Sequence, residues 1–454
     1  MATIMGWNIL LDKASDIPLY HQLSNSLAEL IIANKISADA KLPPIRQMAR
    51  ALDVNTTTVV NAYKKLEQRR LVYSITGSGT YAAKLTHAAT PHTQTPLIGE
   101  DFINFAQTAT EAAFFPVTAF KRAFDIVMDR DGGTAFGYHE AHGYDPLRES
   151  ACKLIGDLGI KSSLENIHII STAKHGLDIM ASTLLSAGDM VFVEQPASHV
   201  AVAAFAGVFA KIIEMPMAKD GPDFVNLEVL LKKHRPKLFY VTPNYQHPKG
   251  ICYSYESKRR LLQLAHEIDA YIIEEDQLSD FYYDGSIKTP LKALDDEGRV
   301  IFIKGFSRIL TPGIGIGFLV CHSNITATKP YENNPPGYTQ RVFDCFLRSG
   351  DYELHTANMR TMYARRYLKM TTAVSTYLAP FADFVLPGGG LSLWVTPHVP
   401  GDYTGLFIKK KIAVSPGQLF SADMQGFRLS FAAVSEDRIA EGIGAIASVL
   451  HTHR

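Results

Sequence analysis

The sequence predicts a multi-domain protein: a small α+β unit, then a large α/β unit that ends in a smaller α+β lobe. The chain has 454 residues, about three times the ~150 residues of a typical domain. Residues 1–84 carry ten Lys and Arg but six Asp and Glu, whereas the whole chain is neutral, so a basic segment precedes an acidic remainder. This charge distribution is typical of a nucleic-acid-binding unit attached to a larger body.

The predicted domain boundaries follow these shifts in composition. Residues 1–84 form the first domain. The stretch LTHAATPHTQTPLIGE at 85–100 has no apolar period, which is typical of a linker. Residues 101–335 form the large domain and residues 336–454 form the small C-terminal lobe, and the Pro-rich loop ENNPPGY at 332–338 marks the passage between them.

Composition excludes several classes of protein. A hydrophobic content of 46% and a charged content of 20% are those of a folded chain. The longest apolar run, at 200–210, is shorter than the ~18 residues that a membrane helix requires, and the first residues lack the basic start of a secretory leader. The four cysteines are scattered without a CxxC pair. We therefore expect a cytoplasmic protein with no membrane partner and no metal site.

Helical periodicity organises the first domain. Leucines recur at helical spacing from Leu19 to Leu30. A second helix follows Pro44 in LPPIRQMARALDV, and Asn55 is a good N-cap for a third, TTTVVNAYKKLEQRR. LVYSI and TYAA then flank the turn-rich tip TGSG, as two short strands would. This order predicts a winged helix-turn-helix, whose third helix presents hydroxyl and amide side chains to the major groove of DNA.

The segment LPPIRQMARALDVNTTTVVNAYKKLEQRRLV, followed by GSGTY, resembles the DNA-binding domain of the GntR family, with Pro44 where the family usually has Ser. The resemblance implies that this domain binds a double-stranded DNA operator and that Gly77 and Gly79 bring the wing tip to the minor groove. The helix residues expected at the DNA are Arg46, Thr56, Thr57, Thr58, Asn61 and Lys64. The alternative is that the Thr run only begins a helix and that Arg46 is a surface charge.

Strand-like apolar runs alternate with helical patterns in the large domain. The runs are MVFVEQP from Met190, LFYVTP from Leu238, YIIEED from Tyr271, VIFIKGF from Val300 and GIGFLVC from Gly315. Apolar strands that alternate with helices predict a mostly parallel sheet with helices on both faces. Ligands of such sheets bind beyond the carboxyl ends of the strands.

Several segments of this region resemble a fold-type I aminotransferase, as in the MocR subgroup of the GntR regulators. They are FGYHEAHGYDPLRESA, VTPNYQHPKG, IIEEDQLSDFYYDG, IKGFSRILTPGIGIGFLV, PGGGLSLWV, SPGQLF and GFRLSFA. The resemblance covers almost all of the chain beyond the linker, and it implies a homodimer. It also implies a pocket built for pyridoxal 5'-phosphate, which needs a lysine amine, a carboxylate at the ring nitrogen and donors for the phosphate at a helix start.

The sequence departs from that family pattern at five positions of the pocket. Arg308 stands at the position of the Schiff-base lysine, and a guanidinium that stays charged is not a usable nucleophile. Glu275 and Gln277 replace the Asp and Tyr that hold the ring. Gly315 and Ala173 replace the Arg and Ser of the phosphate cradle. We therefore expect no covalent cofactor and no enzymatic activity, while non-covalent binding of pyridoxal 5'-phosphate stays open.

Other side chains of the pocket favour an anionic ligand. By the resemblance, Arg428 matches the arginine that binds the substrate α-carboxylate in aminotransferases. We expect a small anionic or amino-acid-like effector, with a carboxylate or phosphate group, bound by Lys174, His175, Asn244, Glu275, Gln277, Arg308 and Arg428. The alternative is that Arg308 pairs with Glu275 and fills a purely structural cavity. Lys304 lies inside a predicted strand and is expected to point elsewhere.

These expectations predict a DNA-binding transcription regulator whose aminotransferase-like domain dimerises and senses a small anionic effector. Two other functions stay open. The first is a pyridoxal-phosphate-dependent aminotransferase with a DNA-binding appendage, against which Arg308 argues because such an enzyme requires a Schiff base. The second is a ligand-free dimerisation scaffold that only spaces the DNA-binding heads, and it predicts an operator affinity that no metabolite changes.

Overall fold

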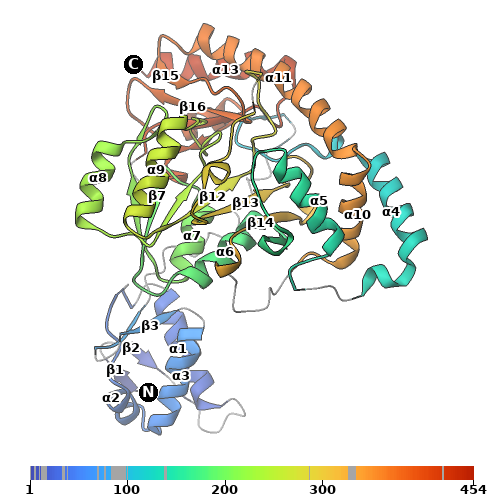
Figure 1. Cartoon of the computed structure of the whole chain (residues 1–454). Coiled ribbons are helices and arrows are strands. Elements are labelled where there is room, and N and C mark those ends of the chain that lie inside the picture. Colours follow the sequence, from blue (N-terminus) through green and yellow to red (C-terminus); the bar gives the residue numbers. More distant parts are fainter. Residues whose placement is uncertain are drawn as a thin grey trace. The chain divides into compact units, whose positions relative to one another are not determined.

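The computed structural model describes residues 2–4, 7–9, 11, 18–32, 36–37, 39–68, 71–75, 78–82, 99, 101–137, 141–285, 287–325, 334–421 and 424–453. The chain divides into two compact units, residues 1–93 and residues 94–454, and each is described by itself. Figure 1 colours the chain from blue at the N-terminus to red at the C-terminus. Of the helices in the described ranges, none has the length and apolar character needed to cross a membrane.

The first unit contains a β-hairpin, three helices and a two-stranded wing in its described residues. The hairpin pairs β1 (Ala2–Ile4) with β2 (Trp7–Ile9), the helices are α1 (Leu19–Ile32), α2 (Ile45–Ala51) and α3 (Thr56–Gln68), and the wing pairs β3 (Val72–Ile75) with β4 (Gly79–Ala82), antiparallel. The predicted winged helix-turn-helix is therefore confirmed. The N-terminal hairpin has no counterpart in the sequence prediction.

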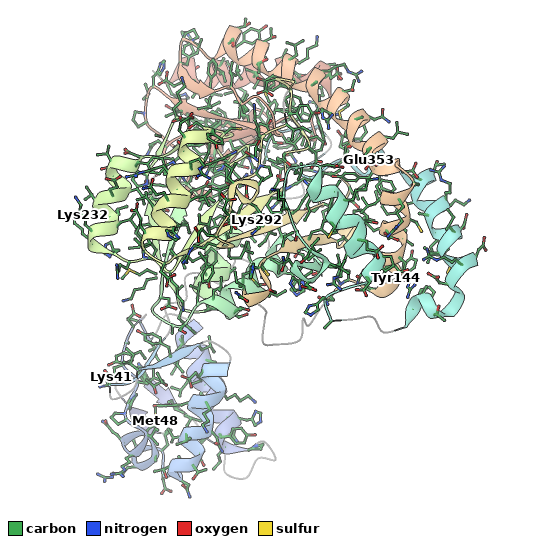
Figure 2. The ribbon with its side chains drawn as sticks, viewed as in Figure 1. Lys41, Met48, Tyr144, Lys232, Lys292 and Glu353 are labelled. Carbon is green, nitrogen blue, oxygen red and sulfur yellow. The ribbon has the colours of Figure 1, made fainter. Side chains whose placement is uncertain are left out.

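Local chemistry explains why these elements form. The side chain of Asn55 accepts the backbone N–H of Thr57 at 2.9 Å, so the predicted N-cap of α3 is confirmed. Leu23 of α1, Met48 of α2 and Val59 of α3 are fully buried and form one core between the three helices. Figure 2 shows the side chain of Met48 inside this unit. An amphipathic face on each helix is thus sufficient to close the small domain.

The second unit is built on a seven-stranded sheet in the order β6-β14-β13-β12-β11-β7-β8. Its strands are β6 (Ile167–Ile170), β7 (Met190–Glu194), β8 (Lys211–Met215), β11 (Leu238–Val241), β12 (Tyr271–Asp276), β13 (Val300–Gly305) and β14 (Gly317–Val320). β14 runs antiparallel to both of its neighbours, and all other pairs are parallel. The five strands expected from the sequence are all present. β6 and β8, at the two edges of the sheet, are additional.

Helices cover both faces of this sheet (Figure 1). α6 (Ala173–Leu184) and α7 (His199–Gly207) share a core with Val191 and Tyr240. α8 (Phe224–Lys233) and α9 (Tyr255–Glu267) share a core with Phe192 and Phe239 on the other face. Neighbouring residues of one strand therefore point to opposite faces, as the pleat of a strand requires. The buried strands consequently have apolar residues on both sides, which is the pattern that predicted them.

The remaining helices and strands surround this sheet or form the small lobe. The helices are α4 (Val117–Asp131), α5 (Asp145–Gly156), α10 (Gly337–Arg348), α11 (Asp351–Tyr377), α12 (Thr404–Lys409) and α13 (Glu436–Thr452). The small lobe has a four-stranded antiparallel sheet in the order β15 (Ala382–Val385), β16 (Ser392–Pro397), β19 (Phe427–Ser430) and β18 (Ser415–Pro416), and α11 packs beside α13. Two short pairs, β5 (Ile103–Asn104) with β17 (Ile412–Ala413) and β9 (Met217–Ala218) with β10 (Gly221–Pro222), complete the strands. The pairing of β5 with β17 joins the start of the large domain to the C-terminal lobe.

A buried ion cluster ties the centre of the sheet to α11. Lys304 of β13 is 1% exposed and lies 2.7 Å from Asp280 and 3.4 Å from Asp276, its register partner on β12. Tyr352 of α11 donates its hydroxyl to Asp280 at 3.0 Å. Burial lowers the pKa of Lys304, but the two carboxylates outweigh burial and hold that pKa above its usual value. The amine is therefore charged and engaged inside the core.

Replacing Lys304 by Met should destabilise the protein by about 3–5 kcal/mol, because the substitution leaves two buried carboxylates without their cation. Urea unfolding measures this change. The matched control is Lys174→Met on α6, since that amine is 57% exposed in its ion pair with Asp178, and exposed pairs contribute about 0–1 kcal/mol. An equal loss in the two variants would contradict the structural role of the cluster.

Candidate functional site

A cavity of about 240 Å³ lies at the carboxyl ends of the central strands. Its wall is formed by the segments that follow β7, β11, β12 and β13, the start of α6, Thr108, and Leu391 and Ser392 beside β16. Ligand sites of open α/β sheets lie at this end of the strands. The side chains that carry its chemistry are Thr108, Lys174, Tyr240, Asn244, Tyr245, His247, Glu275, Gln277 and Arg308.

Glu275 lies near the end of β12 with both carboxylate oxygens engaged. The hydroxyl of Tyr240 donates to Oε2 at 2.5 Å, and the amide of Gln277 donates to Oε1. Burial raises the pKa of Glu275, while these two donors and the charge of Arg308 act in the opposite direction. The period of two along β12 places Glu275 at the cavity while Asp276 enters the core cluster.

Arg308 projects into the cavity without a carboxylate partner. Its Nε donates to Oε1 of Gln277 at 3.4 Å, and its Nη1 donates to the hydroxyl of Thr108. Within the described residues no ion pair joins Arg308 to Glu275, because Gln277 stands between them. The hydroxyl of Thr110 also donates to the backbone carbonyl of Arg308 at 2.5 Å. The alternative that Arg308 and Glu275 form a direct pair is therefore wrong.

Arg428 of β19 lies beside the cavity, and it is not one of the residues that line it. The side chain is 6% exposed, and its Nη2 donates to the carbonyl of Ala106 and to the hydroxyl of Ser415, both at 2.7 Å. Its Nη1 lies 3.3 Å from Nε2 of His247, and its buried Nε has no partner among the described residues. Burial, and secondarily the charge of Arg308, lower the pKa of Arg428 to about 9.

His247 is a wall residue that the sequence analysis did not single out. Its ring packs edge-to-face against Phe420 with the centroids 5.4 Å apart. Burial, followed by the charges of Arg428, Arg308 and His199, holds the pKa of His247 well below its usual value, so the imidazole is neutral at pH 7. The sequence signal that could have identified His247 was its position directly before Pro-Lys-Gly in the motif VTPNYQHPKG.

Three other expected effector residues are occupied by protein partners. Lys174 lines the cavity but pairs with Asp178 at 2.6 Å. The ring of His175 lies 3.1 Å from the hydroxyl of Ser171, and His175 does not line the cavity. Asn244 lines the cavity, but its Oδ1 accepts from Lys258 at 2.8 Å and its Nδ2 donates to a backbone carbonyl. The structure therefore brings five of the seven expected residues to the cavity, and of these Glu275, Gln277 and Arg308 are linked by hydrogen bonds to one another.

A second hollow of about 220 Å³ adjoins the cavity across Arg308, at the start of α6. Ala173 and Gly315 line it and supply no side-chain donors. Gly315 adopts a left-handed conformation with φ 59°. The hydroxyl of Thr172 accepts the backbone N–H of His175 at 3.0 Å, so part of the donor capacity of the helix start is already used.

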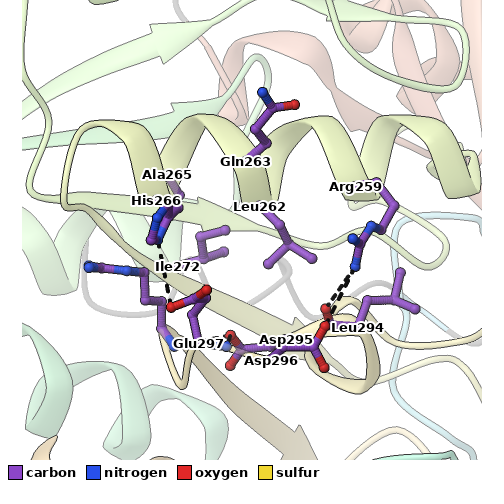
Figure 3. A pocket seen from close by; sticks show the side chains of 11 residues that line it. Arg259, Leu262, Gln263, Ala265, His266, Ile272, Leu294, Asp295, Asp296 and Glu297 are labelled. Carbon is purple, nitrogen blue, oxygen red and sulfur yellow. Dashed lines mark hydrogen bonds and ion pairs between the residues drawn. The ribbon is translucent and has the colours of Figure 1, made fainter.

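A third hollow, of about 190 Å³, lies between α9 and the loop at 294–299 (Figure 3). It is at the amino end of β12, opposite to the strand ends that form the cavity. Arg259 lies 3.8 Å from Asp296, and His266 lies 3.8 Å from Glu297. Because its charges pair with one another, this hollow offers no unmet charge to a ligand. Among the described residues, no group of three or more His, Cys, Asp or Glu side chains is placed to hold a metal ion.

The residues expected at DNA lie on α2, on α3 and in the wing. Arg46, Thr56, Thr57, Asn61 and Lys64 are exposed, and Thr58 is half-buried. Gly79 has φ 134°, a backbone conformation that residues with a Cβ rarely adopt, so the position favours glycine. Gly77 lies outside the described residues.

Each of the two units matches a known protein family. The family model described as "Aminotransferase class I and II" matches residues 101–446, and the model described as "Bacterial regulatory proteins, gntR family" matches residues 19–82. The probable rhizopine catabolism regulatory protein MocR of Rhizobium meliloti is 27% identical over 412 residues, which cover 85% of this chain and 83% of that protein.

Proteins that are named as aminotransferases, and not as regulators, are similar to the second unit of this chain. Aromatic-amino-acid aminotransferase 1 of Thermococcus litoralis is 27% identical, over 77% of this chain and 88% of its own length. The crystal structure of Pyrococcus horikoshii kynurenine aminotransferase in complex with PMP superposes with a TM-score of 0.74 and 30% identity, covering 78% of this chain and 92% of that chain. The fold of the second unit is thus that of aminotransferases of this class.

Proposed function

The chain belongs to the aminotransferase class I and II family and joins that fold to a gntR-type DNA-binding domain, and from this premise we propose that it regulates transcription by sensing a small anionic effector without covalent chemistry. The observation that carries the proposal is Arg308, a guanidinium that faces the cavity with only neutral partners. A half-buried cation whose direct hydrogen-bond partners are neutral favours an anionic ligand, which adds negative charge and accepts further hydrogen bonds.

The residues of the cavity do not fit a covalently bound pyridoxal 5'-phosphate. Among the residues that the structure describes, Lys174 is the one lysine that lines the cavity, and it pairs with Asp178 on the surface of α6. Lys304 is fixed in the core cluster, away from the cavity. Both oxygens of Glu275 already accept hydrogen bonds, and Ala173 and Gly315 offer no side chain to a phosphate. The effector in this proposal therefore binds non-covalently.

The same proposal assigns operator recognition to the first unit and dimerisation to the second. Thr57, Asn61 and Lys64 recur along α3 at helical spacing with exposed side chains, as a recognition helix requires. Paired winged helices bind two half-sites, so a homodimer matches the symmetry of an operator.

Combining Arg46→Ala with Thr57→Ala should weaken binding to double-stranded DNA from the gene's own promoter region by at least tenfold. Each lost base contact costs about 1–3 kcal/mol, and a lost phosphate contact also reduces the salt dependence. Fluorescence anisotropy over a range of salt concentrations measures both effects. Lys232→Ala on α8 is the control and should bind as the wild type does. Wild-type affinity in the double variant would assign DNA contact to other residues.

Incubation with pyridoxal 5'-phosphate followed by borohydride should leave the protein unmodified, because no lysine amine is free in the cavity. Intact-mass spectrometry and peptide mapping measure the modification. An aminotransferase that has the Schiff-base lysine is treated in parallel as the control for reduction. A stoichiometric pyridoxyl group on one side chain of this protein would contradict the proposal and favour the enzyme.

Thermal-shift measurements on the full chain should identify anions that raise its midpoint, since a ligand of the native state at 100 times its Kd adds ~2.7 kcal/mol. The panel contains acetate, succinate, 2-oxo acids, inorganic phosphate and simple phosphate esters. Arg308→Met should abolish the shift, and Lys174→Met should retain it. If no anion raises the midpoint or changes operator affinity, the ligand-free scaffold is the better account.

A further inference from the structure

The contact between Arg428 and His247 fixes the hydrogen position on the imidazole. A guanidinium has donors and no acceptor. Nη1 of Arg428 lies 3.3 Å from Nε2 of His247, so this nitrogen must accept the hydrogen bond. The hydrogen of the neutral ring is then on Nδ1. Arg428 is 6% exposed, and Ala106 and Ser415 hold its Nη2, so the protein determines the orientation of the donor.

The Nδ1–H group of His247 is available to a ligand. His247 lines the cavity, and its Nδ1 has no hydrogen-bond partner in the described part of the chain. Arg428 lies behind this wall and does not itself line the cavity. The guanidinium can therefore influence a ligand through the imidazole without touching the ligand.

The charges that line the cavity disfavour an ammonium group. Arg308 brings a positive charge without a carboxylate in its own hydrogen bonds, Lys174 is paired with Asp178, and Glu275 is the one acid among the described lining residues. Both oxygens of Glu275 are engaged by Tyr240 and Gln277. A ligand ammonium would meet the charge of Arg308 and would find no free carboxylate, which is how a site rejects a near-identical competitor.

We propose that the cavity selects small oxo or hydroxy acids over the corresponding amino acids, with the ligand carboxylate on Arg308, a neighbouring oxygen accepting from Nδ1–H of His247, and Arg428 as the positioning residue that fixes this tautomer. The inference rests on the proposed sensing of an anion and adds the class of ligand. It assigns Arg428 an indirect role, in contrast to direct binding of a carboxylate. A carboxylate with an adjacent oxygen acceptor matches the donors of Arg308 and His247, which both line the cavity.

The ligand class is tested with probes of one carbon skeleton. Isothermal titration calorimetry on the full-length protein compares pyruvate, L-lactate and L-alanine, and then 2-oxoglutarate, 2-hydroxyglutarate and L-glutamate. In at least one series, the oxo or hydroxy acid should bind at least tenfold more tightly than the amino acid. Equal or tighter binding of the amino acids overturns the proposal, and so does the absence of binding by all six probes.

Matched variants of His247 test which nitrogen serves the ligand. An Asn side chain places its amide near the position of Nδ1, whereas a Gln side chain places it near Nε2. His247→Asn should keep the affinity for the preferred acid within about threefold and keep the preference over the amino acid. His247→Gln should lose at least tenfold in affinity. The opposite order, or equal affinities, overturns the assignment of Nδ1.

Variants of Arg428 test whether it acts through His247. Arg428→Lys retains a donor without an acceptor and should keep the preference for the oxo or hydroxy acid, whereas Arg428→Met should lose it. Adding Arg428→Met to His247→Gln should cost less than threefold further, because the two changes interrupt one interaction. If the losses of affinity in the two variants are fully additive, Arg428 binds the ligand directly, and the proposed positioning role of Arg428 is overturned. A fluorescence check of the thermal midpoint confirms that each variant is folded.

Failure of this inference differs from failure of the proposed function. If phosphate or other anions of the thermal-shift panel bind through Arg308 but the six acids show no preference, sensing stands and the ligand class is wrong. If no anion binds at all, both fail together.

Discussion

A guanidinium held at the ends of the sheet by neutral partners constrains the chemistry of the whole cavity. Arg308 donates to the amide of Gln277 and to the hydroxyl of Thr108. An amide has both a donor and an acceptor, so Gln277 can serve Glu275 with its nitrogen and Arg308 with its oxygen. Glu275 and Arg308 are thereby linked without forming an ion pair. Glu275 offsets the charge of the guanidinium only across Gln277, so Arg308 keeps the capacity to bind an anion directly.

The substitutions around Arg308 form one consistent arrangement rather than independent losses. Glu275 accepts a hydrogen bond from the buried hydroxyl of Tyr240 at 2.5 Å. Its carboxylate is therefore a structural acceptor of the sheet. At the start of α6, Ala173 lines the second hollow without a polar side chain. The fold of an aminotransferase is kept, and Gln277 binds both Glu275 and Arg308.

The sequence predicted elements with strong local patterns and missed contacts between distant segments. The wing, the Asn55 cap and the five inner strands follow from turn residues and apolar runs. The sequence did not predict β8, because its run KIIEM lies at the edge of the sheet and is only partly buried. Asn244 was assigned by its place in a motif, yet its partner Lys258 comes from α9. Likewise, Thr108 accepts a hydrogen bond from Arg308, which is 200 residues away in the sequence. No local sequence pattern can predict such a contact.

The cavity wall comes from both lobes of the second unit, so the proposed effector would contact both of them. Leu391 and Ser392 belong to the small lobe, whereas Glu275 and Arg308 belong to the central sheet. A ligand that contacts both sides stabilises one arrangement of the lobes over another, and it can shift an equilibrium only by its difference in affinity for the two. Coupling to DNA must then be reciprocal, so that operator DNA changes the affinity for the effector by the same factor. For the proposed anion, the difference would lie in whether Arg308 of the sheet and Ser392 of the small lobe reach it together.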